Sequence, residues 1–212
     1  MKVILQSIRQ TILWTIICGI IYPFLITVIA QVAFHDQANG SLVTRDGKLV
    51  GSALMAQQFT GSNYFWPRPS ACTYGSAPTT PANSTGLVAS SGSNLGPTSG
   101  TLQTNVMNNA ASFISGNNLP TNTPVPADMV FASASGLDPH ISPEAAQLQV
   151  ARVASSRGLG ADAVRQLVDK YTEGPQWGFL GEPRVNVLLL NVALDQMDTK
   201  KPAPAPAPPA RT

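Results

Sequence analysis

The hydrophobic pattern of the chain begins with one long, uncharged apolar run. Residues 11–34 read TILWTIICGIIYPFLITVIAQVAF and contain no Asp, Glu, Lys or Arg. About 20 apolar residues in a helix cross the hydrocarbon core of a bilayer. The apolar part of a signal peptide is usually only about 7–15 residues long and ends at a small-residue cleavage site. The run is longer than that and no clean Ala-x-Ala follows it, so the pattern predicts one transmembrane helix over residues 11–34.

The charges that flank this run predict its orientation. Lys2 and Arg9 precede the run, whereas His35 and Asp36 follow it. Positive charge is enriched on the cytoplasmic side of membrane spans. We therefore expect residues 1–10 in the cytoplasm, a single pass through the plasma (inner) membrane, and a soluble extracytoplasmic domain.

That domain is expected over residues 35–198, and its pattern mixes strands and helices. Residues 42–45 and 48–55 have β-type composition and flank Asp46-Gly47, a favoured hairpin turn. Longer apolar segments at residues 125–133 and 185–191 predict two further strands. Between the hairpin and these strands, residues 71–100 are rich in Ser, Thr, Gly, Pro and Asn, which predicts a long loop.

Three segments of the domain carry the spacing of helices. Residues 101–117 place Leu102, Val106, Ala110 and Phe113 on one face, and Val164, Leu167, Val168 and Tyr171 do the same after Asp162. The clearest helix begins with Ser142 as N-cap and Pro143 at the first helical position, and it ends at Gly158. Together these elements predict an α+β fold, with one transmembrane helix followed by one mixed α/β extracytoplasmic domain. Residues 199–212 form a Pro/Ala tail that is expected to be disordered.

Three adjacent aromatic residues, Tyr64, Phe65 and Trp66, precede Pro67 and Pro69. Aromatic side chains of this kind form belts at membrane interfaces. They also fill cores, where rigid prolines fix their position, and this second interpretation is favoured.

Charge adds little to the domain. The chain has 13 Lys and Arg, and two of them, Lys2 and Arg9, precede the apolar run. The domain therefore has 11 Lys and Arg against 11 Asp and Glu, and no net charge. A neutral domain has no electrostatic reason to bind nucleic acid. Charged residues make up 11% of the chain against about 25% in an average protein, and residues 49–127 contain one charged side chain, that of Arg68.

The residues that usually carry catalysis are scarce. The sequence contains no Walker A loop, HExxH or GxSxG motif. Asp138 and His140 supply two candidate metal ligands, which is a poor site, and a turn histidine with a hydrogen-bond partner is the preferred interpretation. Cys18 lies in the apolar run and Cys72 in the domain, so no disulfide is expected. We therefore predict no autonomous catalytic site and no metal site.

One charge-poor loop is the candidate site of interaction. In residues 91–98, Ser93, Asn94 and Thr98 offer neutral oxygen atoms among glycines that permit unusual turns. Carbonyl and other neutral oxygens replace water around K⁺ in channels, so these residues form a candidate ion-entrance loop. The alternative is that Gly92 and Gly96 only shape a turn against the C-terminal half of the domain.

Several strings of residues occur in a fixed order and together resemble one protein family. They are YFWxRPSA from Tyr64, SGSNLGPT from Ser91, ASGLDPHISP from Ala134, GEPRVNVL from Gly181 and LNxALD from Leu190, where x marks a position outside the resemblance; at one of these, Pro67 stands where Ser is commoner in the family. With the N-terminal apolar run, they resemble the C subunit of the Kdp-type potassium-transporting P-type ATPase over about residues 5–198.

The resemblance implies a function that composition alone does not give. It implies an accessory, non-pumping subunit of a high-affinity potassium pump, with a channel-like potassium-binding subunit and an ATPase subunit as partners in a lipid membrane. The family is described as a catalytic chaperone that raises the affinity of the ATPase subunit for ATP, so ATP is implied through that subunit. No cofactor is assigned to this chain directly, because ATP is cytoplasmic and the domain is expected outside. The alternative function is a stand-alone, membrane-anchored envelope binding domain.

Overall fold

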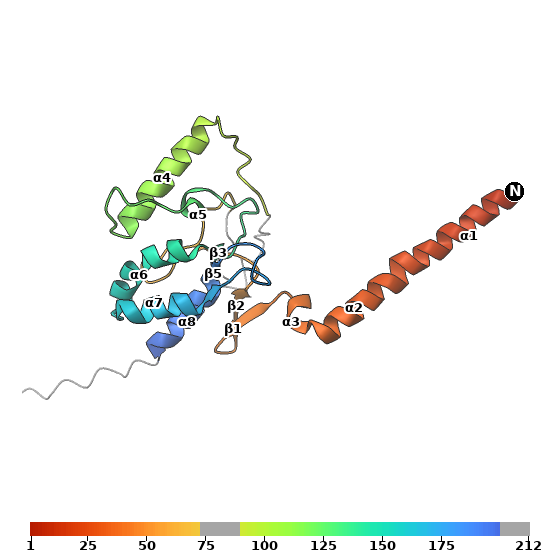
Figure 1. Cartoon of the computed structure of the whole chain (residues 1–212). Helices are drawn as coiled ribbons and strands as arrows, with labels where there is room; N and C mark the ends of the chain where they lie inside the picture. The colour runs from red at the N-terminus through yellow and green to blue at the C-terminus, as the bar shows by residue number, and fades with distance from the viewer. Residues whose placement is uncertain (73–89, 200–212) are drawn as a thin grey trace, which may run out of the picture. The chain divides into compact units, whose positions relative to one another are not determined.

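The computed structural model describes residues 1–72 and 90–199 of the 212-residue chain, which divides into two compact units, Met1–Val43 and Thr44–Thr212 (Figure 1). Most of the predicted loop over residues 71–100, and all but the first residue of the predicted Pro/Ala tail over residues 199–212, lie outside the described residues.

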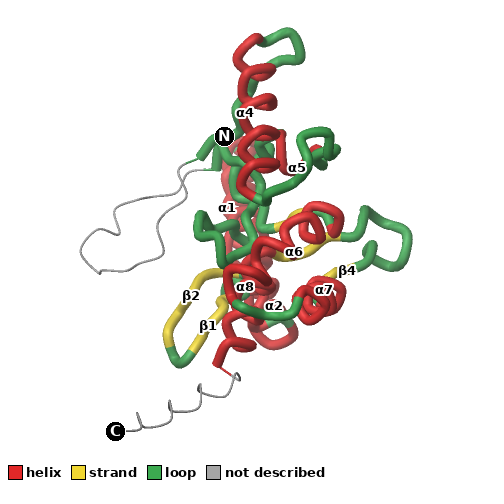
Figure 2. Tube along the Cα trace, turned by 90° about the vertical axis from the view of Figure 1, so that its left-hand side faces the viewer, coloured by secondary structure: helices red, strands yellow, loops and turns green. Residues whose placement is uncertain are grey.

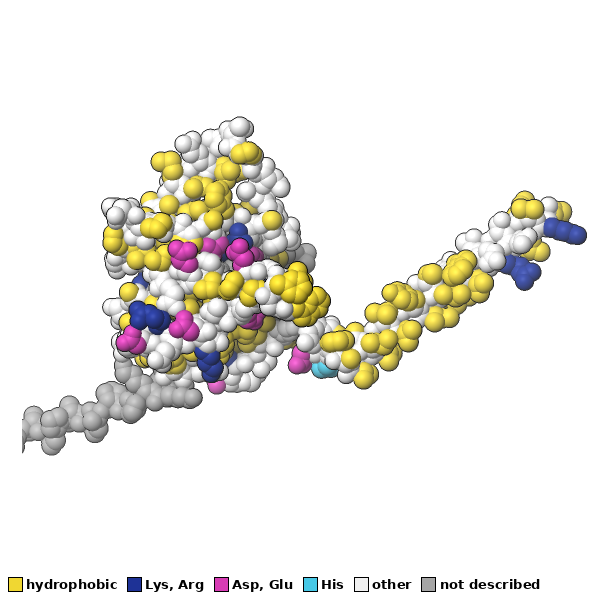
Figure 3. All heavy atoms as spheres, in the orientation of Figure 1, with side chains coloured by type: hydrophobic (Ala, Val, Ile, Leu, Met, Phe, Trp, Pro, Cys, Tyr) yellow, Lys and Arg dark blue, Asp and Glu magenta, His cyan; other side chains and the backbone are white. Residues whose placement is uncertain are grey.

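The first unit is built on a continuous apolar helix that spans Lys2–Ala33. It consists of α1 (Lys2–Ile16), a π-helical turn (Ile17–Ile21) and α2 (Tyr22–Ala33), and a short helix α3 (His35–Ala38) follows it. In the described part of the chain this is the one helix long and apolar enough to cross a membrane, with a mean hydropathy of 2.4. Hydrophobic side chains cover it, and basic side chains lie near its N-terminal end (Figure 3). The helix includes most of the predicted span and begins earlier than predicted.

The π-helical turn accounts for the proline in the middle of this helix. Proline has no N–H and its ring collides with the carbonyl group one turn earlier, which at Pro23 is that of Gly19. The chain widens at this point: the N–H of Tyr22 bonds to the oxygen of Ile17, five residues earlier. Such single wide turns relieve local conflicts inside α-helices. The hydroxyl of Thr27 then donates to the oxygen of Pro23 at 2.8 Å.

The second unit combines helices with small antiparallel sheets. β1 (Leu42–Arg45) pairs with β2 (Lys48–Ser52), and the predicted Asp46-Gly47 turn joins them, with positive φ at both residues. β2 ends before the predicted Met55. The second sheet has the order β3-β5-β4, and its strands are β3 (His140–Ile141), β4 (Thr172–Glu173) and β5 (Arg184–Asn186). In it His140 lies opposite Asn186, and Thr172 lies opposite Val185.

The helices of this unit are α4 (Gly100–Gly116), α5 (Ala127–Val130), α6 (Pro143–Arg157), α7 (Ala161–Lys170) and α8 (Val187–Thr199). Figure 2 shows α6, α7 and α8 gathered together, whereas α4 extends away from them and packs near α5. The mixed helix and strand content confirms the predicted fold class.

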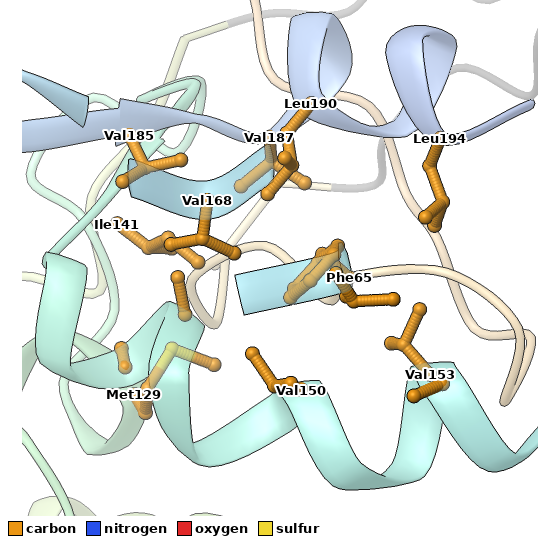
Figure 4. Close-up of a cluster of buried hydrophobic side chains, with 14 of the residues drawn as sticks. Phe65, Met129, Ile141, Val150, Val153, Val168, Val185, Val187, Leu190 and Leu194 are labelled. Atoms are coloured by element: carbon orange, nitrogen blue, oxygen red, sulfur yellow. The ribbon is translucent and has the colours of Figure 1, made fainter. Parts of the chain in front are cut away.

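The core lies where α6, α7 and α8 meet β5. Its buried side chains include Ile141, Val150, Val153, Val164, Val168, Val185, Val187, Leu190 and Leu194. Phe65 comes from a segment far away in sequence, is fully buried, and lies between α6 and α8 (Figure 4). The interpretation as a core element is therefore confirmed for Phe65, whereas Tyr64 and Trp66 beside it are only partly buried.

The helix signals in the sequence are also confirmed. The hydroxyl of Ser142 accepts a hydrogen bond from the N–H of Ala145 at 3.1 Å, and α6 ends at Gly158, which has φ +61°. The helix predicted over residues 101–117 is α4, which begins one residue earlier, with Ser99 as an N-cap that the sequence analysis did not single out. In α7, Val164 and Val168 are buried as their spacing predicts.

The strand predicted at residues 125–133 is wrong, because the segment contains the helical turn α5. Met129 and Val130 are adjacent and both buried. A strand would place neighbouring side chains on opposite faces, whereas one helical turn directs both toward the core.

The strand predicted at residues 185–191 is correct only at its start. β5 ends at Asn186, and α8 begins at Val187. The side-chain oxygen of Asn186 accepts from the N–H of Leu189 at 3.1 Å, so Asn186 caps the helix. Val187, Leu190, Asn191 and Leu194, which are all buried, then follow the spacing of one helix face.

Candidate functional site

Segments from three of the strings singled out in the sequence meet at one polar hollow of about 520 Å³. Arg68 comes from the proline-rich segment after Trp66, Asp138 and His140 from the start of β3, and Glu182 and Arg184 from the start of β5. Antiparallel pairing of β3 with β5 brings the last two segments together. The fold thus gathers residues that are far apart in sequence at one surface.

Asp138 is the centre of this hollow. Its carboxylate accepts from the Arg68 guanidinium at 2.7 Å and from the backbone N–H of His140 at 3.0 Å, and Nδ1 of His140 lies 3.4 Å away. Burial by itself raises the pKa of Asp138, but the hydrogen bonds from His140 and Arg68 outweigh it and lower the pKa to about 2. The group is therefore a permanent anion near neutral pH, which makes it a poor proton acceptor.

His140 was predicted to lie in a turn, which is wrong, because it is the first residue of strand β3 and pairs with Asn186; its imidazole faces the Asp138 carboxylate. The described residues contain no group of three or more His, Cys, Asp or Glu side chains placed to hold a metal ion. Asp128, at the same hollow, accepts from the backbone N–H of Ser142 at 2.6 Å and also contacts the Ser142 hydroxyl. These contacts hold α5 against the start of α6.

A second polar network holds the segment 61–66, here called the aromatic strap, against the core. The side-chain amide of Asn191 on α8 accepts from the N–H of Phe65 at 2.9 Å and donates to its carbonyl oxygen at 3.0 Å. From the other side, Gln149 on α6 accepts from the N–H of Trp66 at 2.8 Å. Two buried side chains thus replace the strand partners that the strap lacks.

Two arginines of α6 complete this network. Arg152 donates to the carbonyl oxygens of Ser62 and Tyr64, at 2.6 and 2.9 Å, and its guanidinium lies 3.9 Å from the centre of the Trp66 ring. Burial lowers its pKa to about 10, so it stays charged at neutral pH. Arg157 donates to the Asn63 carbonyl and lies over the Tyr64 ring.

Asp195 on α8 receives the remaining contacts. It forms ion pairs with Arg157, at 2.7 Å, and with Arg45 of β1, and the Tyr64 hydroxyl contacts it at 3.3 Å. One carboxylate therefore connects the hairpin, the strap and α6. The residues of this network, apart from the strap itself, were missed by sequence reasoning. The available signal was the position of Gln149 and Arg152 in the sequence, where helix spacing places them among the small apolar residues of the buried face of α6.

The predicted loop over residues 91–98 divides into an anchored start and an exposed remainder. The N–H of Ser91 bonds to the carbonyl oxygen of Ser135 at 3.0 Å, and a Cβ at Gly92 would lie 2.8 Å from the carbonyl oxygen of Ala134. The start of the loop is therefore packed against the C-terminal half of the domain, as the alternative interpretation expects.

The three candidate residues of this loop lie elsewhere in it. Ser93, Asn94 and Thr98 are all exposed, and none of their side chains bonds to another described residue. Asn94 has φ +53°, a left-handed conformation that Asn adopts more easily than most residues. Beyond Gly96 the chain turns directly into α4, so the loop and α4 form one surface without charged side chains, residues 90–117. This surface is here called the neutral lobe. The loop does not line the hollow around Asp138.

Comparison with known proteins points to one family. The family model described as "KdpC: K+-transporting ATPase, c chain" matches residues 4–196. The potassium-transporting ATPase KdpC subunit of Methylococcus capsulatus is 50% identical over 192 residues, which cover 90% of this chain and 96% of that protein. The subunit of the same name from Geobacter metallireducens is 48% identical over 199 residues, covering 93% and 99%. That from Koribacter versatilis is 44% identical over 205 residues, covering 97% and 98%.

Proposed function

Because this chain belongs to the KdpC family of potassium-transporting ATPase subunits, we propose that it is the accessory, non-pumping subunit of a high-affinity, ATP-driven potassium uptake complex. One observation carries the proposal: the family match over residues 4–196 includes both the long apolar helix and the whole folded core. Its partners are then a channel-like potassium-binding subunit and an ATPase subunit, with the lipid membrane around its helix.

The proposed orientation places residues 1–10 in the cytoplasm and the domain outside the plasma membrane. Lys2 and Arg9 lie at the N-terminal end of the apolar helix, and Asp36 follows its C-terminal end. Short cytoplasmic segments beside membrane spans carry an excess of Lys and Arg, and this rule supports the orientation. A phosphatase fused after residue 212 is expected to be active, and a fluorescent protein at the same point is expected to be dark. The reverse result would place the domain in the cytoplasm.

The neutral lobe is the surface best suited to lie near an external entrance for potassium. Within residues 90–117 the only polar groups are backbone, hydroxyl and amide groups. Such groups compete with water for K⁺ without trapping it by full charge. Ser93, Asn94 and Thr98 are exposed and hold no partner among the described residues, so their oxygen atoms are free to face an ion or another subunit.

The same orientation limits how this subunit acts on ATP. An external domain does not touch a cytoplasmic nucleotide, so a chaperone effect on ATP affinity has to travel through the other subunits. Coupling between distant sites typically amounts to about 1–3 kcal/mol, or a roughly 5- to 150-fold change in affinity. We propose that the subunit stabilises an assembled state in which the ATPase subunit binds ATP more tightly.

Co-purification separates this function from that of a stand-alone envelope domain. The full chain with an affinity tag is purified from membranes in a mild detergent, and the bound proteins are identified. Recovery of both larger subunits in a constant ratio is expected. Recovery of the chain alone, under conditions in which the other two subunits stay together, would favour the stand-alone alternative.

A further inference from the structure

The connection between β4 and β5 exposes a group of large hydrophobic side chains that the proposed function does not use. Trp177 is 86% exposed, Phe179 is 73% exposed and Leu180 is 45% exposed. These three residues are here called the aromatic tip. In Figure 3, hydrophobic side chains gather on the surface of the domain in the region where Figure 1 draws this connection.

The aromatic tip is held outward by a defined turn. The N–H of Gln176 donates to the oxygen of Leu180, and the N–H of Leu180 donates back to Gln176, both at 2.9 Å. Trp177 has φ +54° and Gly178 has φ +84°. A positive φ is uncommon for a bulky residue and persists where the surrounding structure imposes it, often at sites of function.

The base of the turn is also fixed. Thr172 and Glu173 of β4 pair with Val185 and Arg184 of β5, and the Arg184 guanidinium contacts the Glu173 carboxylate at 3.2 Å. Val185 is fully buried in the core. The tip is thus a rigid extension of the domain, and its exposed rings do not fold back onto it.

Two observations favour a lipid surface as the binding partner of the aromatic tip: the composition of the tip and the covalent link between the domain and the apolar helix. Residues 174–181 contain no charged side chain, so no charge is desolvated when they leave water. Trp is enriched at the level of lipid headgroups, and Phe and Leu are typical of the apolar face of segments that lie in this interface. The domain unit begins at Thr44, shortly after the apolar helix ends at Ala33. Even if fully extended, this linker spans no more than about 35 Å, so the domain that carries the tip always stays close to the membrane that holds the helix.

We propose that the aromatic tip inserts into the headgroup region of the membrane leaflet that faces the domain, as a weak second contact beside the apolar helix. Such a contact restricts how the domain tilts on its short linker. The inference goes beyond the proposed function and requires only the membrane anchor, because the tip acts in the same way without the other subunits.

Lipid quenching of tryptophan fluorescence tests this inference on the full chain alone, reconstituted in zwitterionic lipid nanodiscs. The chain has three tryptophans, so Trp14→Phe leaves Trp66 in the domain and Trp177 in the tip. Phospholipid brominated near the headgroup is expected to quench this variant, and the quenching is expected to be lost when Trp177→Phe is added. Phe179→Ser, which keeps the Trp177 reporter, is expected to reduce the quenching.

A matched control moves the reporter to another exposed aromatic position. Phe131 is 44% exposed and lies after α5, so Phe131→Trp in the background without Trp14 and Trp177 is expected to show no quenching beyond that of Trp66. Equal quenching with and without Trp177, or equal quenching at position 131, would overturn the inference. If lipid quenching is absent and Phe179→Ser weakens co-purification of the larger subunits, the tip binds protein and the lipid contact is refuted. Because no other subunit is present in the quenching experiment, its failure leaves the proposed function untouched.

Discussion

Replacing Asn191 by Ala is expected to loosen the aromatic strap and destabilise the whole domain. Asn191 is 1% exposed, and its amide bonds to both the N–H and the carbonyl oxygen of Phe65. Its loss leaves two backbone groups beside the core without partners. Each unsatisfied buried group costs about 1–3 kcal/mol. Because water that enters the space partly satisfies the two groups, we expect the free energy of unfolding to fall by roughly 3 kcal/mol. For a domain of this size, that corresponds to a decrease in melting temperature of roughly 6–12 °C.

The assay is urea or thermal unfolding of the purified full chain in detergent, followed by tryptophan fluorescence, because Trp66 lies in the strap. Asn108→Ala is the matched control, since Asn108 is exposed on α4 and bonds to no described side chain; its effect is expected to stay within about 0.5 kcal/mol. Asn191→Asp is expected to destabilise the domain at neutral pH and to recover in part as the buried carboxyl becomes protonated. If Asn191→Ala changes stability no more than Asn108→Ala does, the strap is not held as described.

Three further predictions concern the hollow, the loop and the apolar helix. The carboxyl of Asp138 has a pKa of about 2 against an ordinary value of 3.8, so its contribution to the free energy of unfolding is present above about pH 5 and is lost as the pH falls toward 2. This loss is about 1–2 kcal/mol after allowance for the partial exposure of the side chain. In Asp138→Asn, unfolding measured across the same pH range is expected to lack it. Asn94→Gly removes the amide while suiting the positive φ, so it is expected to change the apparent potassium affinity of the assembled pump and to leave the melting temperature nearly unaltered. An unchanged affinity would show that the Asn94 side chain does not act on potassium. Removal of residues 1–34 is expected to leave a soluble, folded, monomeric domain that no longer supports potassium-dependent ATPase activity, whereas full activity on adding that domain to the other subunits would make the helix only a tether.

Local signals in the sequence predicted the elements that local chemistry determines. Ser142, Pro143 and Gly158 mark the ends of α6 through capping and backbone preference, which act within a few residues. The apolar helix follows from its missing charges in the same way. Asn186 was a local signal that went unread: it ends β5 and caps α8, and the branched residues after it have strand composition but helix spacing.

The parts that could not be predicted depend on contacts between distant residues. Asn191 and Phe65 are 126 positions apart, and Arg152 reaches Tyr64 across 88 positions. No periodicity records such a pairing. The same holds for the hollow around Asp138, because its partner Arg68 lies 70 positions earlier. The three loop residues could be singled out for their oxygen atoms, but their exposure became evident only from the folded domain.

We propose above that this chain completes a potassium pump without catalysing the reaction itself. The most direct test of this proposal is potassium-stimulated ATP hydrolysis by the channel-like and ATPase subunits, measured over a range of ATP concentrations with and without the full chain. We expect little potassium-dependent activity without the chain. On its addition, we expect the activity to recover and the ATP concentration for half-maximal rate to fall. Equal rates and equal ATP dependence in both preparations would contradict the proposal.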